Sequence, residues 1–278
     1  MKKNHTNNFL VFAVFHPNGI KYFKEFILNF KSQSKINDLF ITFNNVVPNL
    51  NIKNMIDSEN NFKIITYSTD VAPGLSRIKS FKKIIRLNYK YVIFLDCDDL
   101  MDKKRCEKIA KEIKDHDFLV NNLIPFKRKN FLKKIIKKKD KKIYLKEILD
   151  RNFIGNSTLT IKLKCLKKII KHLDYESIAF DWCIATNLLL KEFRGIYLGN
   201  IITFYRQHNQ NVHKKFVNKE KIIQNILIKK KHYEFFKNKD QIFIRKLKNL
   251  NIFEKKFLSN PKEYSKKKYE NHHKWWIL

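Results

Sequence analysis

One short segment, residues 91–102 (YVIFLDCDDLMD), constrains the fold of this chain more than any other. It joins an apolar run, typical of a buried strand, directly to the aspartates Asp96, Asp98 and Asp99. Carboxylates this close together repel one another, so they usually gather where a cation binds. The chain as a whole is strongly basic, with 59 Lys and Arg against 26 Asp and Glu and a net charge of +33. We therefore interpret the acidic cluster as a binding site and not as ordinary surface.

Short apolar runs alternate with helical patterns through much of the chain. Continuous apolar runs predict strands, and apolar residues at helical spacing predict the helices between them. This alternation indicates an α/β fold, with a mostly parallel sheet flanked by helices. The predicted strands are 9–15, 39–43, 62–67, 91–95, 118–123, 159–163 and 199–205, and the predicted helices are 20–31, 75–87, 103–114, 144–150 and 181–192.

Polar residues follow each of the first four predicted strands. In open α/β sheets a ligand binds at the carboxyl ends of the strands. We expect these residues to share one edge: His16, Pro17 and Asn18, then Asn44 and Asn45, then 68–70, and finally 96–99.

Asp96 and Asp98 are the candidate metal ligands. Hard carboxylate oxygens suit Mg²⁺ or Mn²⁺, and either ion could neutralise a diphosphate leaving group. The alternative is that the aspartates only start the next helix and complement its dipole. We assign that role to Asp99 and Asp102, because capping uses one carboxylate and leaves Asp96 and Asp98 unexplained.

The segment FLDCDD (94–99) resembles the metal-binding motif of family 2-type glycosyltransferases with the GT-A fold. In that family a strand ending in FLDxDD holds the metal of a nucleotide-sugar donor. A second similarity is GLSRIKS (74–80), which precedes the motif at the expected interval. The resemblance implies that Arg77 and Lys79 face the donor diphosphate, where the helix N-terminus adds its dipole. Both would equally suit the solvated face of a helix in a lysine-rich chain.

The resemblance also implies a general base at the start of a later helix. The family carries an acidic pair there, usually Glu-Asp, whose Asp takes the proton of the acceptor hydroxyl. The corresponding segment is AFDWC (179–183), so Asp181 matches and Phe180 stands in place of Glu. Helix capping is the alternative role for Asp181. Asp174 and Glu176 are weaker substitutes.

Residues 204–213 (FYRQHNQNVH) resemble the closing segment of the family. The resemblance implies that Arg206 contacts an anion of the donor. It also implies that His208 binds the metal or a phosphate when the loop folds over the donor.

The chain departs from the family pattern after its first two strands. HPNG (16–19) follows the first strand in place of Pro-x-Tyr-Asn, and Asn44-Asn45 stands where most members have an Asp that binds the base. An amide both donates and accepts hydrogen bonds, whereas a carboxylate only accepts them. We retain His16 and Asn44 as donor-site candidates and leave the nucleotide base open.

The expected organisation is a GT-A domain at 1–213 followed by a basic helical extension at 214–278. Within the domain, 1–123 would bind the nucleotide sugar and 124–213 the acceptor. The basic stretch 127–142 interrupts the α/β rhythm, so we expect an excursion or a flexible arm there.

The extension carries an apolar helical stripe and a terminal tryptophan pair. A basic helix ending in tryptophans suits an anionic membrane interface. Packing of the stripe on the domain is the alternative, and we favour it. The residues concerned are Ile222, Ile223, Ile226, Leu227, Trp275 and Trp276.

These features predict a metal-dependent, inverting glycosyltransferase that uses Mn²⁺ or Mg²⁺. It would move a sugar from a nucleotide-sugar donor to a glycan, lipid-linked or protein-linked hydroxyl in bacterial surface polysaccharide or glycoconjugate synthesis. Inversion is implied by the resemblance alone. The four cysteines form no CxxC pair, and no apolar run reaches the roughly 18 residues of a membrane span. We therefore expect a cytoplasmic protein that at most associates peripherally with the inner face of the membrane.

Two other functions fit parts of the sequence. A nucleotidyltransferase can also end a strand in metal-binding aspartates, but it would carry a Gly-rich phosphate loop where HPNG (16–19) stands. A nucleic-acid-binding protein would exploit the charge of +33. The acidic cluster would repel a nucleic-acid backbone, so we expect no specific nucleic-acid partner.

Overall fold

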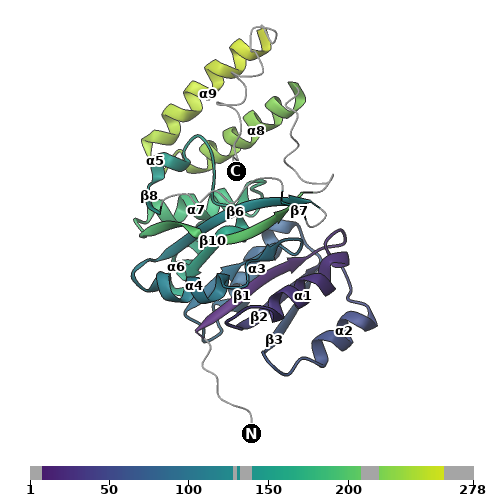
Figure 1. The fold of residues 1–278 in the computed structure, drawn as a ribbon. Helices are drawn as coiled ribbons and strands as arrows, with labels where there is room; N and C mark the ends of the chain where they lie inside the picture. The colour runs from purple at the N-terminus through teal and green to yellow at the C-terminus, as the bar shows by residue number, and fades with distance from the viewer. Residues whose placement is uncertain (1–7, 128–129, 132–139, 208–218, 260–278) are drawn as a thin grey trace.

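The computed structural model describes residues 8–127, 130–131, 140–207 and 219–259 (Figure 1). Its centre is one curled sheet with the strand order β3-β2-β1-β4-β9-β6-β10-β5, to which β7 and β8 add at β6 and β10. The strands are β1 (Phe9–Phe15), β2 (Asp38–Asn44), β3 (Ile64–Thr69), β4 (Tyr91–Phe94), β5 (Leu100–Met101), β6 (Phe118–Lys127), β7 (Asn130–Phe131), β8 (Lys141–Ile143), β9 (Leu159–Lys162) and β10 (Gly195–Arg206).

The mostly parallel sheet predicted from the sequence is confirmed. One group of strands, β3, β2, β1 and β4, runs parallel, and β6 and β10 form a second parallel pair. β9 lies between these two groups and is antiparallel to both β4 and β6. The carboxyl ends of the parallel strands therefore share one edge with the start of β9.

Helices cover both faces of the sheet (Figure 1). The α-helices are α1 (Phe23–Lys31), α2 (Leu50–Asp57), α3 (Pro73–Ile84), α4 (Arg105–Glu112), α5 (Leu145–Ile148), α6 (Leu163–Ile169), α7 (Phe180–Leu190), α8 (Lys219–Phe236) and α9 (Gln241–Ser259). The short 3-10 helices are η1 (Ile20–Tyr22), η2 (Ile113–Asp115), η3 (Asn156–Thr158) and η4 (Ile170–His172).

The core consists of two apolar clusters, one on each face of the sheet. β1 alternates between them: Val11 and Phe15 join the cluster with α1, α2 and α4, whereas Leu10 and Phe12 join the cluster with α3, α6 and α7. Side chains alternate in this way along any strand. Because both faces are covered, the strand reads as a continuous apolar run in the sequence.

The last two helices pack on the second cluster. In Figure 1, α8 and α9 lie together at one end of the molecule, beyond α7. Ile222 and Ile226 of α8 are buried, whereas Leu227 is half exposed. The favoured packing of this stripe on the domain is thus confirmed for its buried members, and Trp275 and Trp276 lie outside the described residues.

Two sequence expectations about the second half were wrong. Strand β10 begins at Gly195 and not at Gly199, because a bulge between Leu198 and Ile202 interrupts its pairing with β6 and hides its period. The basic stretch 127–142 is not simply an arm, because β7 and the start of β8 fall within it and pair with β6 and β10. Its residues 128–129 and 132–139 lie outside the described part.

Cys97, Cys106, Cys165 and Cys183 are free and buried, as expected of small apolar residues. Within the described ranges, the helices are too short or too polar to cross a lipid bilayer.

Candidate active site

The aspartate loop, residues 95–99, leaves the sheet at the end of β4. Its first residue stays in the sheet, because the Leu95 amide donates to the Phe12 carbonyl at 3.0 Å. The next amide, that of Asp96, donates to Ser157 Oγ at 2.8 Å. Asp96 and Asp98 are partly exposed, whereas Asp99 is buried. The loop therefore presents two carboxylates to a ligand and encloses the third.

The turn after β1 packs directly on this loop. A β-carbon on Gly19 would lie 2.3 Å from Cys97 Sγ and 3.3 Å from His16 Nε2. Contacts as short as the first do not occur, so no larger residue fits at position 19 unless Cys97 moves. The exposed side chain of His16 consequently lies beside the aspartate loop, at the edge predicted for it.

Loss of hydration and mutual repulsion raise the pKa of two carboxylates in the loop, Asp99 and Asp96. The pKa of Asp99 lies well above its usual range because the residue is buried and because Asp98 and Asp96 are close. Burial also raises the pKa of Asp96, Arg77 opposes this shift, and Asp98 adds to it. A bound cation would offset each of these penalties.

The donor atoms fit a divalent cation, although the ligand set is incomplete in the described part. Asp99 Oδ2 is buried and has no hydrogen-bond partner among the described residues. In those same residues, no three His, Cys, Asp or Glu side chains form a ready metal site. His208, the further ligand implied by the sequence, lies outside the described residues.

Asp99 does not start the next helix, contrary to our expectation. Helix α4 begins only at Arg105. Asp99 Oδ1 accepts instead from the backbone amide of Arg206, at 3.0 Å. Asp102 does not cap α4 either, because the N-cap residue is Lys104 and no side chain caps it; Asp102 Oδ1 accepts from the Lys104 amide at 3.1 Å in the turn before the helix.

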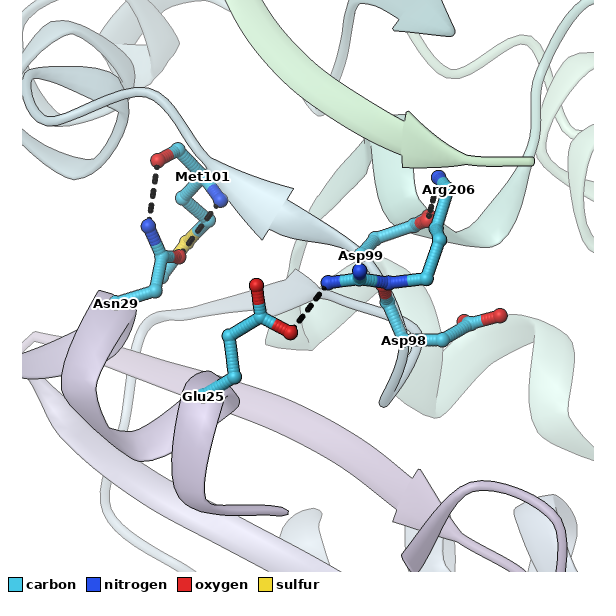
Figure 2. A network of polar contacts seen from close by, with 6 residues as sticks. All are labelled: Glu25, Asn29, Asp98, Asp99, Met101 and Arg206. Carbon is cyan, nitrogen blue, oxygen red and sulfur yellow. Dashed lines mark hydrogen bonds and ion pairs between the residues drawn. The ribbon is translucent and has the colours of Figure 1, made fainter. Parts of the chain in front are cut away.

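Arg206, at the end of β10, fastens the aspartate loop to the rest of the sheet edge (Figure 2). Its Nε donates to the Asp98 carbonyl at 2.7 Å, and its Nη2 pairs with Glu25 of α1 at 2.7 Å. The guanidinium lies 4.7 Å from the ring centroids of both Tyr22 and Phe126. Arg206 is thus held by protein groups on several sides, which is the arrangement of a positioning residue.

Figure 2 also shows how β5 is tied to α1. The Met101 amide donates to Asn29 Oδ1 at 2.8 Å, and Asn29 Nδ2 donates to the Met101 carbonyl at 3.0 Å. This pair of bonds fixes the chain just beyond the aspartate loop.

Asp181 lies in the first turn of α7 and belongs to the same group of charges. It is partly exposed, and its Oδ1 accepts from the Trp182 amide at 2.7 Å. Loss of hydration raises its pKa to about 7; the Trp182 amide opposes the rise, Asp96 adds to it and Arg77 lowers it. A carboxylate with a pKa near the working pH can accept a proton from a substrate.

Helix α3 places Arg77, but not Lys79, with these aspartates. Arg77 is partly exposed and its charge acts on both Asp96 and Asp181. Lys79 follows two residues later, and residues two apart point to opposite sides of an α-helix.

Asn44 ends β2 at the same edge but is buried. Its Oδ1 has no hydrogen-bond partner among the described residues. It is paired in register with Thr69, whose hydroxyl likewise has no partner there.

Sequence reasoning missed Ser157, Glu25 and Arg105. Arg105 is fully buried beneath the loop, where Nη2 donates to the Phe94 carbonyl at 3.1 Å. Burial lowers its pKa to about 10, and the charge of Asp99 opposes that fall. These residues reach the site by tertiary contact, and no local motif marks them.

A cavity of about 540 Å³ lies elsewhere, at the amino ends of β6 and β10. It is lined by Phe193, Arg194, Gly195 and neighbouring residues, and none of the described candidate residues faces it.

Comparison with known proteins identifies the fold but no sequence family. No protein-family model and no curated protein matches the chain. The structure of Staphylococcus aureus TarS 1–349 in complex with UDP-GlcNAc is similar, with a TM-score of 0.63 and 17% identity over 96% of this chain and 78% of that chain. The Pyrobaculum calidifontis mannosyltransferase PcManGT in complex with GDP-Man and Mn²⁺ has a TM-score of 0.58 and 10% identity over 83% of this chain and 64% of that chain. The chain therefore has the GT-A-type fold of these glycosyltransferases, as its sequence resemblance implied.

Proposed function

We propose that this protein is a glycosyltransferase that moves a sugar from a nucleotide-sugar donor to an acceptor hydroxyl. The observation that carries the proposal is that Asp96 follows β4 at the carboxyl edge of the sheet and Asp181 lies in the first turn of α7, where the charges of Asp96 and Arg77 act on the Asp181 carboxyl. Proteins of the same fold were solved with UDP-GlcNAc or with GDP-Man and Mn²⁺, which supports a nucleotide-sugar donor.

Asp96 and Asp98 would hold a divalent cation, Mn²⁺ or Mg²⁺, with His208 as a further candidate ligand. The bound ion would stabilise the negative charge of the departing nucleoside diphosphate. Arg77 and the N-terminus of α3 would add positive charge for the same diphosphate. His16 and Asn44 remain candidates for donor contacts on the β1 and β2 side of the edge.

Asp181 would act as the general base. Its Oδ1 is engaged by the Trp182 amide, which leaves Oδ2 to take the proton of the acceptor hydroxyl. As that proton moves to Asp181, the acceptor oxygen forms its bond to the anomeric carbon. The bond between that carbon and the diphosphate breaks, and its electron pair leaves with the nucleoside diphosphate. A single displacement of this kind inverts the anomeric configuration.

The test combines ligand binding with product analysis. Thermal unfolding would be followed with UDP, GDP and their sugar conjugates, each in Mn²⁺ and in EDTA. We expect metal-dependent stabilisation that Asp98→Ala abolishes and that Asp57→Ala, which removes an exposed acid from α2, leaves intact. Mass spectrometry should then detect a nucleoside diphosphate as the product; pyrophosphate would indicate a nucleotidyltransferase instead. Equal stabilisation in EDTA would contradict the metal site.

We further propose that α9 lets the protein associate with an anionic membrane that carries lipid-linked acceptors. Its outward face interleaves half-exposed aliphatic side chains with exposed basic ones, and its acidic residue Glu254 pairs with Lys230 of α8. Aliphatic and basic groups on one helix face suit a lipid surface, where both find partners. The residues are Ile244, Ile252 and Leu258 with Arg245, Lys248 and Lys255.

Sedimentation with vesicles tests this association. We expect binding to phosphatidylglycerol vesicles, weaker binding to phosphatidylcholine vesicles, and loss of binding in the double variant Ile244→Ser/Ile252→Ser. Leu28→Ser is the matched control, because it removes a similarly exposed aliphatic side chain from α1. Unchanged binding of the double variant would exclude α9 as the contact.

A further inference from the structure

Trp182, the residue after the candidate base, is held firmly in the interior. It is fully buried, and its Nε1 donates to the Ile148 carbonyl at 2.8 Å. Its indole stacks on His232 of α8, with ring centroids 3.8 Å apart and planes 9° from parallel. The C-terminal helical extension therefore contacts α7 one residue away from Asp181.

His232 also bonds to α7 one turn further along. Its Nε2 lies 3.1 Å from Thr186 Oγ1. Trp182 and Thr186 are four residues apart, so they share one face of the helix, and that face meets α8. His232 is buried, and loss of hydration lowers its pKa to about 3, so the ring is neutral at physiological pH. A neutral ring can stay in this apolar position without a counter-charge.

The first turn of α7 depends on such tertiary contacts. Ala179 stands at the N-cap position, and its methyl side chain cannot accept a hydrogen bond from the helix. The Asp181 carboxylate itself accepts from the Trp182 amide, so the base and the start of the helix move together. Whatever holds Trp182 in place also holds Asp181.

We propose that His232 is a positioning residue for glycosyl transfer, which fixes the start of α7 through Trp182 and Thr186 and thereby holds Asp181 beside Asp96 and Arg77. This role rests on the proposed function of Asp181 as the base. A displacement of about 1 Å in a reacting group can lower a rate by about 10²-fold. The extension would then serve catalysis although none of its described residues is among the candidate site residues.

Steady-state kinetics separate positioning from simple stabilisation. We expect His232→Ala to lower kcat by about tenfold or more while the KM for the donor stays within about twofold, because donor binding depends on β4 and α3. His232→Phe keeps a flat ring against Trp182 and should recover much of kcat. Thr186→Val removes only the hydrogen bond and should have an intermediate effect. If His232→Ala does not fold, His232→Leu, which fills the space without a flat ring, takes its place and should show the same loss of kcat.

A double-mutant cycle with the base provides the decisive comparison. In an Asp181→Asn background, removal of the His232 ring should change the residual rate by less than about twofold, because there is no base left to position. Leu250→Ala in α9 is the matched control: it loosens the extension and lowers the unfolding temperature, and kcat well below that temperature should stay unchanged. The role of His232 would be overturned if kcat fell equally in the wild-type and Asp181→Asn backgrounds, or if no His232 variant lost activity. Either result would leave the proposed function intact. A wild-type protein that transfers no sugar would overturn the proposed function itself.

Discussion

Gly74 in the first turn of α3 and Tyr175 in the loop before α7 touch through their backbones. A β-carbon on Gly74 would lie 2.1 Å from the Tyr175 carbonyl oxygen. Arg77 follows Gly74 by three residues, just under one helical turn, and Asp181 follows Tyr175 along the chain into α7. This contact therefore joins the segment that carries the candidate diphosphate cation to the segment that carries the candidate base.

Gly74→Ala should destabilise the protein by about 1–3 kcal/mol, although alanine is the better helix former by roughly 1 kcal/mol. The clash outweighs the propensity because the obstructing atom belongs to the backbone and cannot rotate away. Urea unfolding measures the change, and Lys82→Ala on the exposed side of α3 is the control. A stabilised Gly74→Ala protein would show that this contact is looser than described.

Gly19→Ala should destabilise the protein because the new methyl group would collide with the Cys97 side chain. A second substitution at Cys97 should restore part of the lost stability. Gly19 has φ −90°, which alanine adopts readily, so the cost comes mainly from Cys97 Sγ at 2.3 Å and to a smaller extent from the exposed His16 ring at 3.3 Å. Cys97→Ala removes that sulfur. In urea unfolding, the double variant should be more stable than the sum of the single effects by about 1 kcal/mol or more. Cys97→Ser keeps an atom at the sulfur position and should give less relief.

Asp181 should make the transfer rate depend on pH with a midpoint of about 7. The base must be ionised and this pKa is that of the free enzyme, so kcat/KM should rise as pH increases through that value and level off above it. Because the folded pKa lies above the unfolded one, stability has the opposite dependence: it falls as pH rises from about 4 towards 7. Asp181→Asn should lose both dependences, whereas Glu176→Gln should retain them. The measurements are kcat/KM and urea unfolding across pH.

Asp99→Asn should stabilise the metal-free protein and weaken its response to Mn²⁺. The amide oxygen can still accept from the Arg206 amide, and the cost of a buried charge disappears. Thermal unfolding in EDTA and in Mn²⁺ measures both effects, with Asp102→Asn as the control. A larger Mn²⁺ shift in Asp99→Asn than in the wild type would contradict a role for Asp99 near the cation.

Arg206→Lys should behave as a disruptive change although it keeps the charge. A lysine cannot lie flat between Tyr22 and Phe126 while bonding to both Asp98 and Glu25. We expect a loss of stability of about 1–3 kcal/mol together with weaker metal-dependent nucleotide binding. Arg86→Lys, at an exposed position just beyond α3, should have no effect in the same thermal and calorimetric measurements.

The residues that the sequence placed correctly are those whose position follows from a strand. Asp96 and His16 come directly after apolar runs that can only be buried strands, so their shared edge could be predicted. Asp99 and Arg206 are 107 residues apart and meet only because β5 pairs with β10. No local sequence pattern predicts that pairing. Thr186 and His232, 46 residues apart, are likewise joined by helix packing alone. The sequence also shows the charge of Arg206 but not its bonds to Asp98, Asp99 and Glu25, so only the anion contact implied by the resemblance could be predicted for it.

Strand β9 runs antiparallel to its neighbours β4 and β6. The residues that precede β9 therefore lie at the edge where the parallel strands end, and the residues that follow it do not. Ser157, in the segment just before β9, reaches the aspartate loop and accepts from the Asp96 amide. The segment that precedes β9 can change in length and in its side chains without altering the pairing of the parallel strands on either side of β9. We expect such a layout to let the preference for an acceptor diverge among relatives while the donor side of the protein stays the same.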